Sequence, residues 1–199
     1  MGVVLLDIGN VIVDVDFHRF CLAVSIDGEQ CAETLFRRYC SSEEKNRFDR
    51  GLIAPGEYLG LIARDPEVRP MPSGELKELW QDIFSPKKGV EEAVELLRQK
   101  HRLWIMSDTD PLHFVFLLNN FPVLKQAERY WLSYEHGRLK SQPESFIEVL
   151  NGEVQRSAAD FMLLDDREDN CRSAESCGIR AHRFTAWPLA LEDVRMWES

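Results

Sequence analysis

Three short apolar runs in this sequence each end in side chains that could do chemistry. The runs at residues 3–6, 103–106 and 161–164 are followed by Asp7, by Ser107 and by Asp165-Asp166. Runs of this length and composition are typical of strands buried on both faces of a parallel sheet. The carboxyl ends of such strands form the edge at which open α/β sheets bind their ligands. We therefore expect the aspartates and the serine to meet at one site.

The expected site is crowded with carboxylates, which need partners because an isolated buried charge is costly. Neighbouring carboxylates repel one another, so either a metal ion or a proton must relieve the repulsion. Oxygen ligands favour Mg²⁺ over zinc or copper. Lys140, within residues 137–143, offers a cationic partner. The residue types thus predict a Mg²⁺ site with a lysine beside it.

The hydrophobic pattern changes along the chain. From about residue 17 to residue 84 the apolar residues recur at helical spacing, and no run has the character of a buried strand. The rest of the chain alternates amphipathic helices with short apolar strands, including expected strands at 130–133 and 179–184. Such alternation implies a parallel sheet whose crossover connections are helices.

This pattern predicts the organisation of the chain. We expect an α/β, Rossmann-like core built from residues 1–15 and 86–199. Residues 16–85 are expected to form an all-helical cap, inserted after the first strand and lying over the strand ends.

The composition limits the kinds of partner. The formal net charge of −10 argues against nucleic acid or an anionic membrane surface, since either requires a basic face. A small phosphorylated molecule stays open, because a metal ion and local groups override the overall field. No apolar segment is long enough to span a membrane, and the first residues show no signal-peptide pattern. The five cysteines include no Cys-x-x-Cys pair and are expected to be reduced thiols of a cytoplasmic protein.

The candidate residues fall into four motifs, and in these motifs the chain resembles the haloacid dehalogenase-like (HAD) hydrolase superfamily over nearly its whole length. The matching segments are Asp7-Ile8-Gly9-Asn10-Val11, Ser107 after Trp104-Ile105-Met106, Lys140 within residues 137–146, and Asp165-Asp166-Arg167-Glu168-Asp169-Asn170. Residues 50–58 resemble a segment often seen in the helical caps of the family. Each motif alone is unspecific, and their order and spacing together are specific.

The resemblance implies a nucleophile and a metal site. Asp7 is expected to attack a phosphoryl group and form an aspartyl-phosphate. Mg²⁺ is expected to be bound by Asp7, by the backbone carbonyl of Gly9 and by Asp166, with Asp165 as a further carboxylate beside the metal. Asn170 is expected to orient these ligands.

The resemblance also implies a substrate-binding pocket. Ser107 and Lys140 are expected to bind the phosphoryl oxygens, and Lys140 also to offset transition-state charge, which makes it a catalytic residue with Asp7. Asp108, directly after Ser107, is expected to line the same pocket. The predicted function is Mg²⁺-dependent hydrolysis of a small phosphorylated metabolite, a phosphomonoester, with a sugar phosphate as one candidate.

Two positions depart from the family pattern. Gly9 stands where most family phosphatases have a second aspartate acting as general acid and base, help that is typically worth about 10²–10⁴-fold. The chain resembles a subgroup, the α-D-glucose-1-phosphate phosphatase-like proteins, which also reads D-x-G-N-V and includes active enzymes. Asp108 stands where that subgroup usually has Asn, and its charge opposes phosphate binding. Asp14 and Asp16 are expected to be turn or surface carboxylates rather than substitutes for the missing acid.

Two alternative functions follow from these departures. A haloacid dehalogenase also lacks the second aspartate. It needs no magnesium, however, and without a cation the charges of the Asp165-Asp166 pair would have no partner, which argues against this alternative. A catalytically impaired relative that binds a phosphoryl ligand or a protein partner is favoured by Gly9 and Asp108. The presence of Asp7 and Lys140 argues against this second alternative. The sequence makes no prediction about the oligomeric state.

Overall fold

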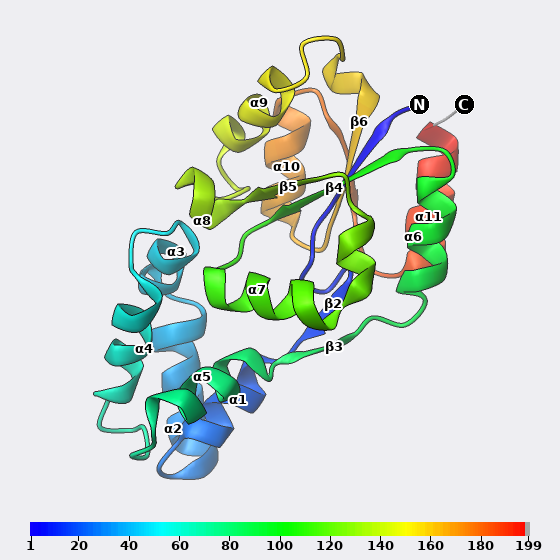
Figure 1. Ribbon diagram of the computed structural model, residues 1–199. Helices are drawn as coiled ribbons and strands as arrows, with labels where there is room; N and C mark the ends of the chain where they lie inside the picture. The colour runs from blue at the N-terminus through cyan, green and yellow to red at the C-terminus, as the bar shows by residue number, and fades with distance from the viewer. Residues whose placement is uncertain (198–199) are drawn as a thin grey trace.

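The computed structural model describes residues 1–197 and has a five-stranded parallel sheet at its centre. The strand order is β5-β4-β1-β6-β7 (Figure 1). The strands are β1 (Val3–Leu6), β4 (Arg102–Ser107), β5 (Arg129–Leu132), β6 (Phe161–Asp165) and β7 (Arg180–Arg183). The first strand of the chain is therefore the central one, and the predicted α/β, Rossmann-like fold class is confirmed.

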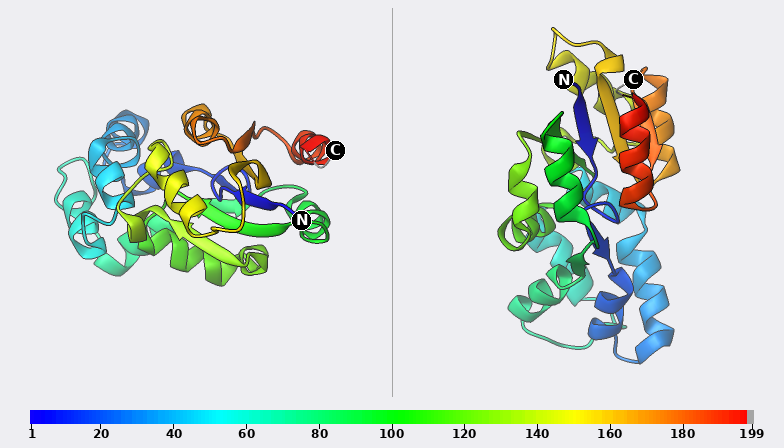
Figure 2. Two further views of the ribbon diagram at one scale, coloured as in Figure 1. Left: turned by 90° about the horizontal axis from the view of Figure 1, so that it is seen from above. Right: turned by 90° about the vertical axis from the view of Figure 1, so that its right-hand side faces the viewer.

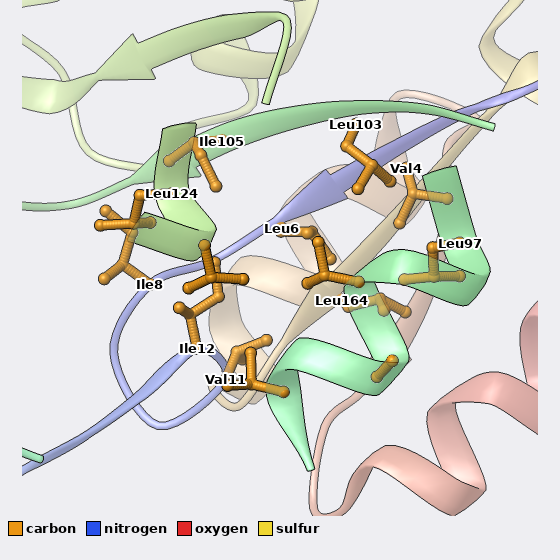
Figure 3. Packing of buried hydrophobic residues seen from close by; sticks show 14 of the residues in the cluster. Val4, Leu6, Ile8, Val11, Ile12, Leu97, Leu103, Ile105, Leu124 and Leu164 are labelled. Atoms are coloured by element: carbon orange, nitrogen blue, oxygen red, sulfur yellow. The ribbon is translucent and has the colours of Figure 1, made fainter. Parts of the chain in front are cut away.

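Helices cover both faces of this sheet, because the side chains of each strand alternate between the two faces. Val4 and Leu6 of β1 belong to one buried cluster, whereas Val3 and Leu5 belong to another. The first face packs against α6 (Val90–Arg98), α7 (Pro111–Asn120), η2 (Pro122–Gln126) and α11 (Trp187–Trp197), and the second against α9 (Pro143–Asn151) and α10 (Glu168–Ser176). Figure 3 shows Leu6 and Leu164 of neighbouring strands packed beside Leu97 of α6. Burial on both faces explains why the three central strands β4, β1 and β6 are mostly apolar, whereas the edge strand β7 carries two arginines and a histidine.

A group of helices inserted between β1 and β4 lies beyond the carboxyl ends of the strands (Figures 1 and 2). We call α1 to α5 the inserted helices. Their bounds, with η1 among them, are α1 (Phe17–Val24), α2 (Gly28–Leu35), η1 (Phe36–Cys40), α3 (Glu43–Asp49), α4 (Pro55–Ala63) and α5 (Ser73–Gln81). They have an apolar core of their own, centred on the fully buried rings of Phe20, Phe48, Tyr58 and Trp80.

The chain enters and leaves the inserted helices through two short strands that pair with each other. These are β2 (Val13–Val15) and β3 (Phe84–Pro86), joined antiparallel. The sequence did not predict this pair, because each strand has only three residues and most of them are partly exposed. The division of the chain at residues 15 and 86 stays a prediction, and the paired strands lie at its two boundaries.

Three further short helices connect elements of the core: α8 (Ser133–His136) and η3 (Ala158–Asp160) precede α9 and β6, and η2 precedes β5. The long α11 was not predicted, although Trp187, Ala190 and Val194 form a buried stripe at helical spacing that could have revealed it. Among the described residues, every helix is too short or too polar to cross a membrane.

Candidate active site

The sheet order brings the predicted site residues to one edge. β1 lies between β4 and β6, so Asp7, Ser107 and Asp165 end neighbouring strands. The backbone N–H of Asp7 donates to the carbonyl of Leu164 at 3.0 Å, which extends the pairing of β1 and β6 up to the site. This carboxyl edge faces the inserted helices (Figure 1).

Lys140 lies at the centre of the site, and only 1% of its surface is exposed. Its Nζ is 2.7 Å from Asp7 Oδ1 and 2.5 Å from Asp165 Oδ2. Asp7 Oδ1 also accepts a hydrogen bond from the backbone N–H of Ile8 at 2.7 Å. In the described part of the chain, no donor reaches Asp7 Oδ2, so one oxygen of this carboxylate is fixed and the other is available to react.

Asp165 fixes the position of Lys140. Its oxygens accept from Lys140 Nζ, from the backbone N–H of Arg167 at 2.9 Å, and from Asn170 Nδ2 at 3.0 and 3.1 Å. The side chain is fully buried. Asp165 was expected beside a metal ion, and the structure gives it a second task, because these donors already occupy both of its oxygens. Asn170 orients Asp165, in keeping with its expected orienting role.

Asp166 is linked to the loop that follows β1. Asn10 Nδ2 donates to Asp166 Oδ2 at 2.9 Å. Asn10 has a φ of 57°, and among the described residues it is the one non-glycine with a positive φ. Asn tolerates this left-handed conformation better than most residues. The turn after Gly9 therefore fixes the loop carrying Asp166, a role for Asn10 that the sequence did not reveal.

The carboxylates fit a hard divalent cation. One oxygen from each of Asp7, Asp165 and Asp166 lies within 4.8 Å of the other two. Burial raises the pKa of Asp7 to about 7; the charges of Asp165 and Asp166 add to this effect, and the Lys140 ammonium opposes it. The Lys140 ammonium contacts two of these three carboxylates, Asp7 and Asp165. The all-oxygen donor set and the excess negative charge suit Mg²⁺.

These groups line a cleft of about 670 Å³ between the sheet edge and the inserted helices. At the sheet end it is lined by Asp7, Gly9, Ser107, Asp108, Lys140 and Asp166. The structure therefore brings all the predicted site residues except the buried Asp165 to the cleft wall. Asp108 Oδ1 accepts from the backbone N–H of Lys140 at 2.9 Å, which ties the pocket loop after β4 to the lysine loop.

The two carboxylates weighed as substitute acids are placed differently. Asp14 pairs with Lys87 and is not among the residues that line the cleft. Asp16 lines the cleft, but its side chain is exposed and caps α1 by accepting from the N–H of Arg19 at 3.0 Å.

A second buried ionic group lies at the other end of the cleft, where the inserted helices meet the core. We call Lys45, Asp49, Asp110 and His113 the junction cluster. Lys45 Nζ pairs with Asp49 and is 3.8 Å from Asp110 Oδ2, while His113 Nδ1 is 2.7 Å from the same oxygen. Burial alone would raise the pKa of Asp110, but His113 and Lys45 lower it to about 2. No motif marks this cluster, because its halves lie more than 60 residues apart and meet only in the fold.

Comparisons with known proteins place the fold. No protein-family model matches the chain. A HAD-family enzyme of Bacteroides thetaiotaomicron is 22% identical over 94% of both chains with a TM-score of 0.77, and its complex with magnesium and inorganic phosphate aligns at 0.74. A HAD-like hydrolase of Porphyromonas gingivalis is 13% identical over 98% of this chain and 97% of its own, at 0.69. L-2-haloacid dehalogenase of Xanthobacter autotrophicus is 15% identical over 98% of this chain and 82% of its own, with a TM-score of 0.64. The chain therefore has the HAD fold, as its motifs predict.

Proposed function

We propose that this protein hydrolyses a small phosphomonoester in a Mg²⁺-dependent reaction through an aspartyl-phosphate. The observation that carries the proposal is the state of Asp7 at the floor of the cleft. Asp7 lines the cleft, one of its oxygens is fixed by Ile8 and Lys140, and no donor among the described residues reaches the other. A nucleophile held in this way is positioned for attack on a bound phosphoryl group.

The chain's own residues divide the work of binding and charge stabilisation. Asp7 Oδ2 attacks phosphorus, while the Lys140 ammonium and the Ser107 hydroxyl bind the phosphoryl oxygens. Asp165 and Asn170 keep Lys140 at the correct place throughout.

Asp7, the Gly9 carbonyl and Asp166 are the residues that would hold Mg²⁺, which neutralises charge between the nucleophile and the phosphate when bound. The Bacteroides enzyme of the same fold has been crystallised with magnesium and inorganic phosphate, which supports this ligand pair. Asp165 is better described as the residue that positions Lys140 than as a direct metal ligand.

The walls of the cleft support a polar metabolite of modest size. Its volume of about 670 Å³ lies in the range of small-molecule sites. At the end away from the sheet, the ring of Phe17 lies with the polar side chains of Ser41, Lys45 and Asn46. An aromatic face with several hydrogen-bonding groups suits a sugar phosphate, and on this proposal the inserted helices act as the cap that selects it.

The carboxylate group argues against dehalogenation. Asp7, Asp165 and Asp166 crowd within 4.8 Å around a single ammonium, an arrangement that a cation-independent dehalogenase has no reason to maintain. A phosphoryl-binding protein with little turnover is the second candidate, and Gly9 favours it, because no carboxyl follows the nucleophile at that position.

The test is release of inorganic phosphate from a panel of sugar phosphates and from p-nitrophenyl phosphate, with Mg²⁺ and with EDTA. We expect turnover only with Mg²⁺, and we expect Asp7→Asn to lower it by about 10⁴-fold or more, because the nucleophile is lost. Asp14→Asn is the matched control, since Asp14 lies outside the cleft.

Wild-type protein that is folded by circular dichroism yet releases no more phosphate than Asp7→Asn would favour the binding protein. Halide release from a 2-haloacid that persists in EDTA would favour the dehalogenase.

A further inference from the structure

Hydrolysis of an alkyl phosphate at this site requires a proton donor. In-line displacement places the attacking and leaving oxygens on opposite sides of phosphorus, so the leaving oxygen points away from Asp7 and towards the inserted helices. An alkoxide is a strong base and leaves readily only when it is protonated. Gly9 supplies no carboxyl for this purpose. The donor must therefore be sought among the other titratable groups that line the cleft.

Besides Lys45, two of these groups belong to the junction cluster, and both are held by buried partners. The Asp49 carboxylate pairs with the buried ammonium of Lys45. His113 Nε2 donates to the Trp80 carbonyl at 2.7 Å, and its Nδ1 faces Asp110. Neither group can move a proton to a substrate without breaking a buried interaction.

Two further groups lie at the exposed rim. His18 Nε2 is 3.2 Å from Glu29, and 45% of the His18 side chain is exposed. Asp16 is also exposed, and its Oδ1 caps α1. Both side chains are exposed to water, and no contact in the described residues fixes either of them next to the phosphoryl pocket.

Asp108 combines three properties: it lies next to the phosphoryl pocket, it is partly buried, and one of its carboxylate oxygens is free. It follows Ser107 directly and lines the same cleft as Asp7. Its Oδ1 is fixed by the backbone N–H of Lys140 at 2.9 Å, and within residues 1–197 no donor reaches Oδ2. Asp108 lines this cleft together with Ser107 and Lys140 of the phosphoryl pocket and with Asp49 of the inserted helices.

The surroundings of Asp108 favour a carboxyl that exchanges protons near neutral pH. Burial raises its pKa to about 6, the charge and N–H of Lys140 oppose the shift, and the carboxylates of Asp49 and Asp165 add to it. The guanidinium of Arg167 also faces it, and is itself held by Asp169. A general acid works best when its pKa lies near the working pH.

On the basis of the proposed hydrolysis, we propose that Asp108 is the proton donor to the leaving oxygen and the proton acceptor from the attacking water. In the first step Asp7 Oδ2 bonds to phosphorus, the bond from phosphorus to the leaving oxygen breaks, and that oxygen takes its electron pair and the Asp108 proton to leave as an alcohol. In the second step Asp108 takes a proton from water as the water oxygen bonds to phosphorus. The bond between Asp7 and phosphorus then breaks, its electron pair returns to Asp7, and inorganic phosphate departs.

The test compares Asp108→Asn with wild type on two substrates. Asn keeps the oxygen that accepts from the Lys140 N–H and removes only the titratable proton. For the best sugar phosphate we expect kcat to fall by about 10²–10⁴-fold. For p-nitrophenyl phosphate, whose phenolate leaves without help, the first step needs no proton and the fall should be roughly tenfold or less.

A pH profile provides a second readout. On the sugar phosphate, wild-type kcat/KM should decline above pH about 6 as Asp108 loses its proton, and this limb should be absent from Asp108→Asn. The control is Asp14→Asn, which removes a carboxylate that pairs with Lys87 outside the cleft, and it should change the turnover of neither substrate.

Several outcomes would overturn the assignment. Equal losses on both substrates would make Asp108 a merely structural residue. Unchanged or increased turnover, with tighter binding of inorganic phosphate, would show that its negative charge only repels the ligand. If wild type releases phosphate from neither substrate, the proposed function fails and this assignment fails with it, whereas active wild type with an unchanged substrate ratio rejects Asp108 alone.

Discussion

Two buried lysines in this molecule have similar surroundings and different consequences. Lys140 lies between Asp7 and Asp165 at the sheet edge, and Lys45 lies between Asp49 and Asp110 at the junction with the inserted helices. Both ammonium groups are almost completely buried.

The difference lies in the balance of charge. In the junction cluster two nitrogen groups, the Lys45 ammonium and the His113 ring, face two carboxylates. At the sheet edge a single lysine faces Asp7, Asp165 and the nearby Asp166. The pKa of Asp110 falls to about 2 beside His113 and Lys45, although burial raises the pKa of Asp49 in the same cluster, and the pKa of Asp7 rises to about 7. A balanced cluster joins two parts of the fold, and an unbalanced one is suited to bind a cation and react.

The largest effect on stability is expected from removing Lys45 from the junction cluster. Lys45→Met leaves Asp49 and Asp110 with only His113, and removing one partner of a buried ion pair costs roughly 3–5 kcal/mol. For a chain of this size that corresponds to a fall in Tm on the order of 10 °C, measured by calorimetry.

The control is Lys87→Met, which breaks an ion pair with Asp14 whose two side chains are 24% and 50% exposed. Such a pair is worth roughly 0–1 kcal/mol. If the two variants lose the same stability, the junction cluster does not hold the inserted helices to the core.

Both ionic groups also show how far the sequence predicts this molecule. The central strands and the positions of Asp7, Ser107 and Asp166 followed from apolar runs that end in polar residues, because parallel strands bring their carboxyl ends together. Lys140 was predicted from the segment that contains it, residues 137–146. Local pattern was enough there, since each residue's place depends on the strand or loop that carries it.

Other features depend on contacts between distant segments, and no local pattern reports them. Lys45 meets Asp110 only after the inserted helices fold back over the sheet edge. Asp165 directly precedes Asp166, which lines the cleft. Only the fold shows that Lys140 and Asn170 donate hydrogen bonds to the oxygens of Asp165. The place of Asp165 beside a metal ion stays a prediction, and the structure adds its contact with Lys140.

A smaller effect on stability is expected from Mg²⁺, and it should be confined to the unbalanced site. A ligand present at about 100 times its Kd stabilises a protein by about 2.7 kcal/mol. We expect Mg²⁺ to raise the Tm of wild type and to raise that of Asp166→Asn much less, because one predicted ligand is lost. Lys45→Met should keep the increment, since the ion pairs of Lys45 are with Asp49 and Asp110 and not with the predicted Mg²⁺ ligands. An increment lost equally from both variants would place the cation elsewhere.

The smallest expected effect is a pH dependence measured in EDTA. Because the pKa of Asp7 is about 7 in the folded protein and 3.8 as the ordinary value, the folded state binds this proton more tightly. The free energy of unfolding should therefore decline as pH rises from about 4 to 7. Asp110 has the opposite sign: its contribution is complete above pH about 4 and is lost only as pH falls towards 2, so it is constant over this window. Asp7→Asn should remove part of the decline, on the order of 1 kcal/mol between pH 5 and 8 in denaturant titrations. Equal slopes for wild type and Asp7→Asn would mean that Lys140 already balances the site and that the contrast between the two lysines is one of position alone.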